Sequence, residues 1–334
     1  MLRSSHVGIQ GGELGTLFCV IVGAGSDIAA SGADDVHVRR FLLQIDCKRQ
    51  GGLHRVWKPG RPDRRGRGLC AVETIPHSGE KIPPEAAWLS KLDERLLMFD
   101  VDRYVDQLYG PVLRGLSIPW IKTEWHRYAC DLNRLAEDID AASVVGSANP
   151  VGTYPRGLHW SMTTTGYPLM PGPISIDRHR EIVARCLSPF HEAVSRVADK
   201  LRPKELRTSA LPLFHLDLHS MPSFGTSEHR DPGEWRADMV ISNQDGKSSS
   251  KDFFELICAS AGAQGFEVRQ NWPYKGGRIT ETYGRPKEGW ETVQIELNRK
   301  LYMNEATKKK NELDFRATQL RVGRMIREIY GQLS

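Results

Sequence analysis

The sequence predicts an α/β fold for the larger, C-terminal part of the chain. From about Leu69 onward, short apolar runs alternate with longer segments in which apolar residues recur at helical spacing. Apolar residues make up 40% of the 334-residue chain and charged residues 26%, which is typical of a globular protein with a sizeable core. No stretch approaches the ~20 apolar residues of a membrane-spanning helix, so a soluble protein is expected.

The expected elements follow one another in order along this region. Apolar residues recur at helical spacing in three segments, 84–109, 177–201 and 306–333. Each apolar stripe is expected to face the core, and in the last segment it consists of Leu313, Leu320, Met325 and Ile329. Short apolar runs predict strands at 69–76, 127–132, 210–218, 236–241, 266–270 and 292–297.

The first 68 residues differ in composition from the remainder. They are rich in glycine and arginine and lack sustained periodicity, which predicts a poorly ordered extension, 1–68, ahead of a domain that spans 69–334. Within 48–68, eight basic side chains accompany one acid, Asp63, whereas the whole chain has a net charge of +5. We interpret this stretch as a solvated linker, because a nucleic-acid site would need aromatic side chains beyond Trp57.

The six cysteines are scattered along the chain. They form no C-x-x-C pair, which indicates reduced thiols and a cytoplasmic location. A signal peptide is an alternative for the N-terminus, but its apolar run, 17–22, is short and follows Glu13. The glycine-containing run 20–27 does not fit a dinucleotide-binding turn, because Ile28 stands where the third glycine belongs.

The segment LFHLDLHS, residues 213–220, is the most informative part of the chain. Alternate residues of a strand share a face, so His215, Asp217 and His219 fall on one face and apolar residues on the other. Burying such polar groups is costly unless they are paired or bind a ligand. A metal site accounts for these residue types, because neutral imidazole is a common ligand that a carboxylate can orient. A hydrogen-bonded His/Asp cluster is the alternative.

Two further segments supply matching residue types. The strand 292–298, TVQIELN, alternates in the same way and places Glu296 on its polar face. Residues 75–80, IPHSGE, carry His77 and Glu80 in an H-x-x-E spacing that allows both side chains to meet one ion. Two histidines and one carboxylate with an open fourth position are typical of a catalytic zinc site. Taken singly, each of these patterns also occurs as ordinary structure.

Several segments, taken together and in this order, resemble the N-formylglutamate amidohydrolase family. They are IPHSGEKIP (75–83), FDVDRYVDQLYG (99–110), HRYACDLNR (126–134), LDLHSMPS (216–223), RADMVISNQDGKS (236–248), NWPYKGGRIT (271–280) and VQIELNRKLYMNE (293–305). The resemblance identifies 69–334 as an N-formylglutamate amidohydrolase-like catalytic domain and leaves the first 68 residues outside it. That family in turn resembles the zinc carboxypeptidases. The resemblance therefore implies a three-layer fold, with a mixed, largely parallel central sheet and helices on both faces.

The resemblance also implies a metal site at the strand ends. It implies one Zn²⁺ held by His77 and His219, with Glu296 as general base and acid. A carboxylate completes the site, and two residues compete for this role. Glu80 corresponds to the ligand of the carboxypeptidases, whereas Asp100 lies in the D-x-D segment that recurs in the formylglutamate family.

The implied reaction is hydrolysis of the amide bond of N-formyl-L-glutamate or a similar N-acyl amino acid, with release of formate or another acid. Zinc would make a water molecule acidic enough to act as the nucleophile. Arg127 is expected to stabilise the tetrahedral oxygen. The expected substrate-binding residues are Asn133, Arg134, Arg278 and Arg299, since guanidinium groups suit carboxylates.

The biological setting and the substrate stay open at this point. Histidine breakdown is the expected pathway, and neither a membrane nor a nucleic acid is an expected partner. In this sequence Arg103 and Tyr104 replace the Trp-His that usually follows the D-x-D segment. This departure favours a different acyl-amino acid or a peptide-like amide as an alternative substrate. A non-catalytic binding protein on the same scaffold is the third hypothesis.

Overall fold

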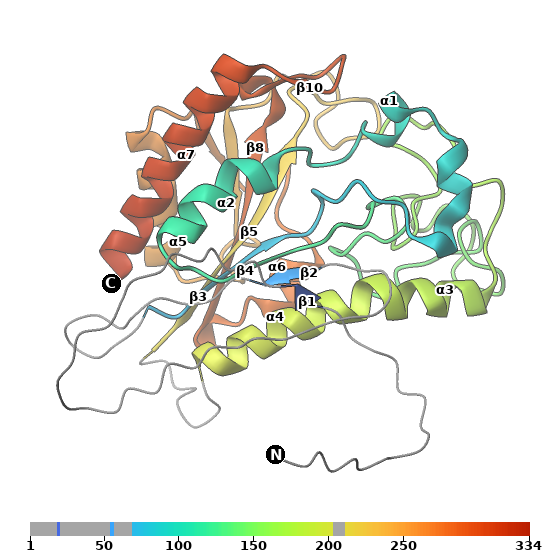
Figure 1. The fold of residues 1–334 in the computed structure, drawn as a ribbon, viewed down its shortest axis with the longest axis horizontal. Helices are drawn as coiled ribbons and strands as arrows, with labels where there is room; N and C mark the ends of the chain where they lie inside the picture. The colour runs from blue at the N-terminus through green and yellow to red at the C-terminus, as the bar shows by residue number, and fades with distance from the viewer. Residues whose placement is uncertain (1–18, 21–53, 57–68, 203–210) are drawn as a thin grey trace, which may run out of the picture.

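The fold is built around a mixed β-sheet, which the computed structural model describes together with its flanking helices (Figure 1). The described residues are 19–20, 54–56, 69–202 and 211–334. Within them the sheet has eight strands in the order β1-β2-β4-β3-β5-β8-β6-β7. The strands are β1 (Cys19–Val20), β2 (His54–Val56), β3 (Ala71–Ile75), β4 (Trp120–Lys122), β5 (Leu213–Met221), β6 (Met239–Ser242), β7 (Val268–Gln270) and β8 (Trp290–Asn298).

Most neighbouring strands run parallel. The pairs β3–β4, β3–β5, β5–β8, β6–β7 and β1–β2 are parallel, whereas β2–β4 and β6–β8 are antiparallel. Because β3, β5 and β8 are parallel neighbours, their carboxyl ends meet at the same edge of the sheet. That edge is where ligands bind in open α/β sheets.

Helices cover both faces of the sheet, so the expected three-layer α/β fold is confirmed (Figure 1). One face carries α2 (Val105–Gly115), α5 (Lys251–Ala263) and α7 (Glu312–Leu333), whose apolar side chains form one core with the strands. The other face carries α3 (Ile176–Ile182), a π-helical turn (Val183–Leu187), α4 (Ser188–Leu201) and α6 (Arg278–Tyr283), which enclose a second core. Within the described ranges, no helix is long and apolar enough to cross a membrane.

Two of the helices begin at a serine that caps them. The Ser175 side chain accepts a hydrogen bond from the Arg178 N–H at the start of α3, and Ser250 does the same for Phe253 in α5. The connections contain short helices, η1 (Pro84–Lys91), α1 (Glu94–Leu97), η4 (Pro286–Glu288) and η5 (Arg299–Leu301), and the hairpin of β9 (Met303–Asn304) and β10 (Lys309–Lys310).

Strand alternation is as expected in β5 and β8. Leu216 and Leu218 pack into the core beneath α2, α5 and α7, as do the apolar residues of β8. The polar residues His215, Asp217 and His219 therefore point to the opposite face, on the side of α4 and α6. All three are buried.

Three expectations for individual elements were wrong, and one strand was missed. Residues 127–132 form turns and not a strand, and the segment 84–109 is divided among three short helices. The strand β4 was missed, because its three residues carry too little periodicity. In α7, Leu313 is 81% exposed and Leu320 60%, whereas Met325 and Ile329 are buried. The proposed extension 1–68 lies almost wholly outside the described residues, so the division at residue 68 stays a prediction.

Candidate active site

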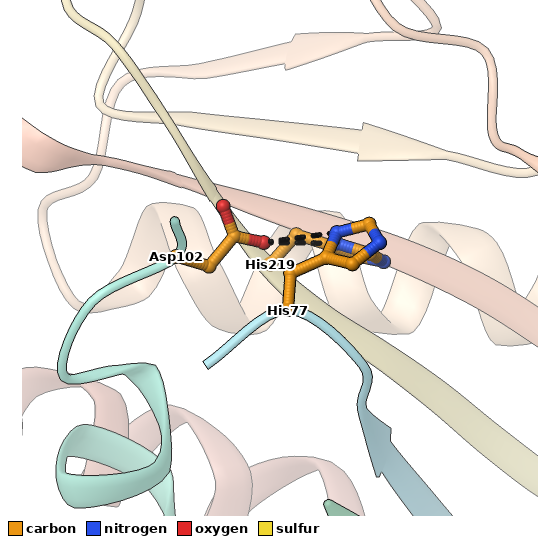
Figure 2. Close-up of side chains that lie close together, drawn as sticks. All are labelled: His77, Asp102 and His219. Carbon is orange, nitrogen blue, oxygen red and sulfur yellow. Dashed lines mark hydrogen bonds and ion pairs between the residues drawn. The ribbon is translucent and has the colours of Figure 1, made fainter. Parts of the chain in front are cut away.

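Three side chains from separate segments meet at the carboxyl ends of the central strands (Figure 2). His77 follows β3, His219 lies in β5, and Asp102 lies in the loop before α2. Asp102 Oδ2 is 3.1 Å from His219 Nδ1 and 3.4 Å from His77 Nδ1. The two Nδ1 atoms are 3.1 Å apart. All three side chains are buried.

Each histidine is oriented by a buried carboxylate on its other ring nitrogen. His77 Nε2 lies 2.7 Å from Asp131 Oδ1, and His219 Nε2 lies 2.8 Å from Asp217 Oδ2. Burial opposes ionisation of Asp131, but His77 and Arg127 outweigh it and hold the pKa of Asp131 well below its usual value. Burial likewise opposes ionisation of Asp217, and the interaction with His219 lowers its pKa. An ionised carboxylate only accepts hydrogen bonds, so each Nε2 donates, and in the neutral ring Nδ1 carries the lone pair.

The convergent atoms fit a divalent cation. Two Nδ1 lone pairs and a carboxylate oxygen face one another and would repel each other without a cation or a proton between them. Two imidazole nitrogens and one carboxylate are the donors of catalytic zinc sites, and histidine ligands of such sites are held by a carboxylate on the other nitrogen. The residues present therefore suit a metal ion.

Two arginines fix Asp102 in this position. Arg299 Nη2 donates to Asp102 Oδ1 at 3.0 Å, and an Arg127 nitrogen lies 3.7 Å from the same oxygen. The backbone N–H of Asp102 also donates to the His77 carbonyl at 3.0 Å. Burial of Asp102 opposes its ionisation, but its contacts with His219 and His77 and the charge of Arg127 hold its pKa well below the usual value. The carboxylate is therefore ionised and held against both histidines.

Glu296 lies beside this cluster. It pairs with His219 in the parallel register of β5 and β8, so the two side chains share a face of the sheet. Its Oε1 accepts a hydrogen bond from Gln294 Nε2 at 2.9 Å. Burial raises the pKa of Glu296 to about 7, although the nearby His219 opposes the shift. A carboxylate with such a pKa can accept and return a proton near neutral pH.

A cavity of about 210 Å³ opens onto the cluster. This is smaller than the ~300–1,000 Å³ of sites for drug-sized ligands, so a small substrate is expected. Its wall includes His77, Asp102, His219 and Glu296, together with four arginines, namely Arg127, Arg134, Arg156 and Arg299. A buried acid–base group and several cations thus face one small volume, which suits hydrolysis of a small anionic molecule.

A sequence model of the N-formylglutamate amidohydrolase family matches residues 70–303. The chain belongs to the N-formylglutamate amidohydrolase family. An N-formylglutamate deformylase of Pseudomonas aeruginosa is 26% identical over 245 residues, which are 72% of this chain and 85% of that protein.

A solved structure agrees with the family assignment. The crystal structure of an N-formylglutamate amidohydrolase from Ralstonia eutropha JMP134 has a TM-score of 0.71 and 26% identity, and the match covers 83% of this chain and 97% of that one. A structure of a protein from Agrobacterium tumefaciens, at 16% identity, has a TM-score of 0.54 over 80% of this chain and 92% of that one. The second likeness concerns the fold alone.

Neither of the two carboxylates that the sequence suggested as metal ligands, Glu80 and Asp100, contacts the histidines of the cluster. The Glu80 side chain is 40% exposed and accepts from Arg103 Nε at 2.8 Å. Asp100 accepts from the hydroxyls of Tyr128 at 2.7 Å and Thr164 at 2.5 Å. The structure places Asp102, the second acid of the D-x-D segment, at the cluster instead.

The expected substrate-binding residues fall into two groups. Asn133 and Arg134 line the cavity of this amidohydrolase-family domain, as does Arg299. Arg278 does not line it, and its Nε and Nη2 donate to the two oxygens of Asp138 at 2.9 and 2.8 Å. The Asn133 side chain also has a structural role, since its Oδ1 accepts a hydrogen bond from the Ile279 N–H at 2.8 Å.

The backbone approaches Asn133 closely at Gly277. A Cβ atom on Gly277 would lie 2.3 Å from Asn133 Nδ2, so only glycine allows this approach. The preceding Gly276 has a φ of +113°, which few other residues adopt. The loop before α6 is thereby held against the cavity wall.

Three contributors to the site were not singled out from the sequence. Asp102 was visible only as part of a D-x-D segment. Asp131 is the first residue of the D-L-N-R segment, but its role depends on a contact with His77, which is 54 positions away. Arg156 carried no signal, because it lies in a loop without a recognisable motif.

Proposed function

We propose that this protein is a zinc-dependent amidohydrolase that cleaves the amide bond of N-formyl-L-glutamate or a similar N-acyl amino acid. The observation that carries the proposal is the His77–Asp102–His219 cluster beside Glu296 in a cavity lined by arginines. The named activity of the Pseudomonas aeruginosa relative supports the choice of substrate. We assign His77, Asp102 and His219 as the metal ligands in place of Glu80 or Asp100.

When bound, zinc supplies a Lewis acid that polarises the substrate carbonyl and lowers the pKa of water. Glu296 takes a proton from the attacking water and delivers it to the leaving amine. Its buried position suits this task, because a pKa near 7 lets the same carboxyl group accept and return the proton. The water oxygen bonds to the carbonyl carbon as Glu296 takes one of its protons, the C–N bond breaks as that proton passes to the nitrogen, and the products are the free acid and the amino acid.

Arg127 is placed to stabilise negative charge on the former carbonyl oxygen. Its guanidinium lies over the Trp160 ring at 4.5 Å and donates to Asp131 Oδ2 at 3.0 Å, so its orientation is fixed before a substrate binds. It also lines the cavity. A preoriented cation in a water-poor site can stabilise developing charge without reorganisation.

Arg134 is the residue that we assign to the α-carboxylate of the substrate. Its guanidinium donates to two backbone carbonyls, of Arg156 at 2.9 Å and of Asn133 at 2.7 Å. Among the described residues it has no ion pair with an acid within 4 Å, so its charge is available to a ligand. Arg299 is less suited to this role because Asp102 and Ser220 already occupy its donors.

The test is an assay of purified protein with N-formyl-L-glutamate. We expect equimolar release of formate and glutamate, loss of activity with a chelator and recovery on addition of Zn²⁺. The His77→Ala variant should be inactive, and Glu296→Gln should be slower by roughly 10²–10⁴-fold. Release that persists in folded His77→Ala protein would overturn the metal mechanism. A non-catalytic binding protein would release nothing. A place in histidine catabolism and a cytoplasmic location stay predictions.

A further inference from the structure

The cavity wall has more arginines than the metal cluster and the proposed reaction require. Of the four arginines that line it, Arg127 and Arg299 are held by Asp131 and Asp102. Arg134 and Arg156 remain. Arg156 has no role in the chemistry described above, and its acid partner is Glu228, 3.5 Å away.

Arg156 is fixed beside Arg134 by the backbone. The Arg156 carbonyl accepts from Arg134 Nε at 2.9 Å. The Leu158 N–H donates to the Asp138 carbonyl at 2.8 Å. A Cβ on Gly157 would lie 2.2 Å from that same oxygen, so the chain around Arg156 packs against the backbone at Asp138 without room for a side chain. The two guanidinium groups thus enter the cavity from adjoining, well-anchored backbone.

The partner of Arg156 is held less firmly. The Arg156 side chain is 24% exposed and that of Glu228 is 41% exposed, and exposed ion pairs hold their partners only weakly. Glu228 precedes His229, which lines the cavity, and Thr226 anchors the same loop by donating to the Thr164 carbonyl at 2.7 Å. Glu228 therefore lies next to two residues of the cavity lining, as an exchangeable carboxylate on Arg156.

We propose that Arg156 determines specificity for a second carboxylate, the one on the side chain of an acidic N-acyl amino acid. Arg134 binds the α-carboxylate, and the side-chain carboxylate replaces Glu228 on Arg156. A guanidinium offers two parallel N–H donors, and a carboxylate can accept from both with its two oxygens. A neutral amide has only one acceptor oxygen and cannot do so. The inference rests on the proposed function and adds to it the residue that selects the acidic side chain of the substrate.

The experiment compares kcat/KM for N-formyl-L-glutamate and for N-formyl-L-glutamine, which differ only in that carboxylate. For Arg156→Gln we expect kcat/KM with the glutamate substrate to fall roughly tenfold to a hundredfold, as for loss of a charge-assisted hydrogen bond. The loss should appear in KM with kcat retained, because the contact is equal in the ground and transition states. Activity on the glutamine substrate should change little.

Two further variants make the test sharper. Glu228→Gln removes the competing carboxylate, so kcat/KM for the glutamate substrate should rise, by roughly two- to fivefold. Arg269→Gln is the matched control, since Arg269 forms an exposed pair with Glu234 at 3.9 Å and does not line the cavity. It should leave both substrates unaffected.

The outcomes separate this inference from the proposed function. An unchanged glutamate-to-glutamine ratio in folded Arg156→Gln protein, or no gain in Glu228→Gln, would overturn the role of Arg156 while the amidohydrolase activity stands. A wild-type protein that hydrolyses neither compound would contradict the proposed function and, with it, this inference.

Discussion

Replacement of Asp131 by asparagine should weaken metal binding without changing any metal ligand. Asp131 Oδ1 accepts from His77 Nε2 at 2.7 Å and from Asn133 N–H at 2.9 Å. Its Oδ2 accepts from Arg127 at 3.0 Å and from Trp160 Nε1 at 2.9 Å. All four partners are donors, so an asparagine must turn its NH₂ group toward two of them in either orientation.

The size of the effect follows from this geometry. If the NH₂ group faces His77, Nε2 becomes an acceptor, the proton moves to Nδ1, and His77 can no longer bind a metal through that atom. Loss of such an orienting partner typically costs 10–100-fold in metal affinity, or about 1.4–2.7 kcal/mol. In either orientation the negative charge of Asp131 is lost, so its buried ion pair with Arg127 is broken, which costs about 3–5 kcal/mol of stability.

The assay is zinc affinity by competition with a chromophoric chelator, combined with urea unfolding of the metal-free protein. Asp231→Asn is a suitable control, because Asp231 also forms a buried two-pronged ion pair, with Arg236 at 2.7 Å, but does not contact a histidine of the cluster. We expect both variants to lose stability and only Asp131→Asn to lose zinc affinity. Folded Asp131→Asn protein with zinc affinity within about twofold of the wild type would refute the reasoning.

Two further predictions concern pH. Glu296 must be ionised to act as a base, and burial raises its pKa to about 7, so kcat/KM should fall as the pH drops through about 7. The Glu296→Gln variant should lose roughly 10²–10⁴-fold in rate while retaining zinc. A pH profile of kcat/KM that is flat between about pH 6 and 8 would contradict this assignment. Glu73 is buried in β3, accepts from Tyr330 and from the Leu216 N–H, and burial raises its pKa well above the usual value. It therefore keeps its proton in the folded state, and the stability that it contributes below about pH 4 is lost as the pH rises. The unfolding free energy of the wild type, relative to Glu73→Gln, should decline between about pH 5 and pH 8, and a constant difference would show that Glu73 is ionised in the fold.

The sequence predicted the parts of the fold that depend on local pattern. Alternation in 213–220 and 292–298 correctly placed His219 and Glu296 on one polar face, because side chains of a strand alternate regardless of tertiary context. The boundaries were less accurate: β5 continues to Met221, three residues beyond the expected end. The turns at 127–132 were read as a strand because their apolar content resembles one.

The proposed ligand set could be predicted only in part. Asp100 and Asp102 have the same side chain and lie two positions apart, and only the path of the loop decides which one reaches His77. That path is set by a hydrogen bond from the Asp102 N–H to the His77 carbonyl and by Arg299, which is 197 positions away. Glu80 follows His77 at a suitable spacing, but Arg103 holds it at the surface.

The roles of the arginines depend in the same way on distant partners. Arg278 and Arg299 had the right charge for substrate binding, but Asp138 and Asp102 occupy their donors. Arg156 lay in no recognisable motif, and its position depends on backbone contacts with the 131–138 segment. The number of charged side chains can be counted from a sequence, but which of them are available to bind a ligand depends on the fold.

The most direct test of the central claim is the zinc content of purified protein after dialysis, measured for the wild type and for Asp102→Ala, Asp100→Ala and Glu80→Ala. We predict that zinc stays bound at about one ion per chain in the wild type and in the Glu80 and Asp100 variants, and is lost from the Asp102 variant. Zinc that is retained by folded Asp102→Ala protein, or lost from the Glu80 variant, would contradict the assignment of the His77–Asp102–His219 cluster as the metal centre.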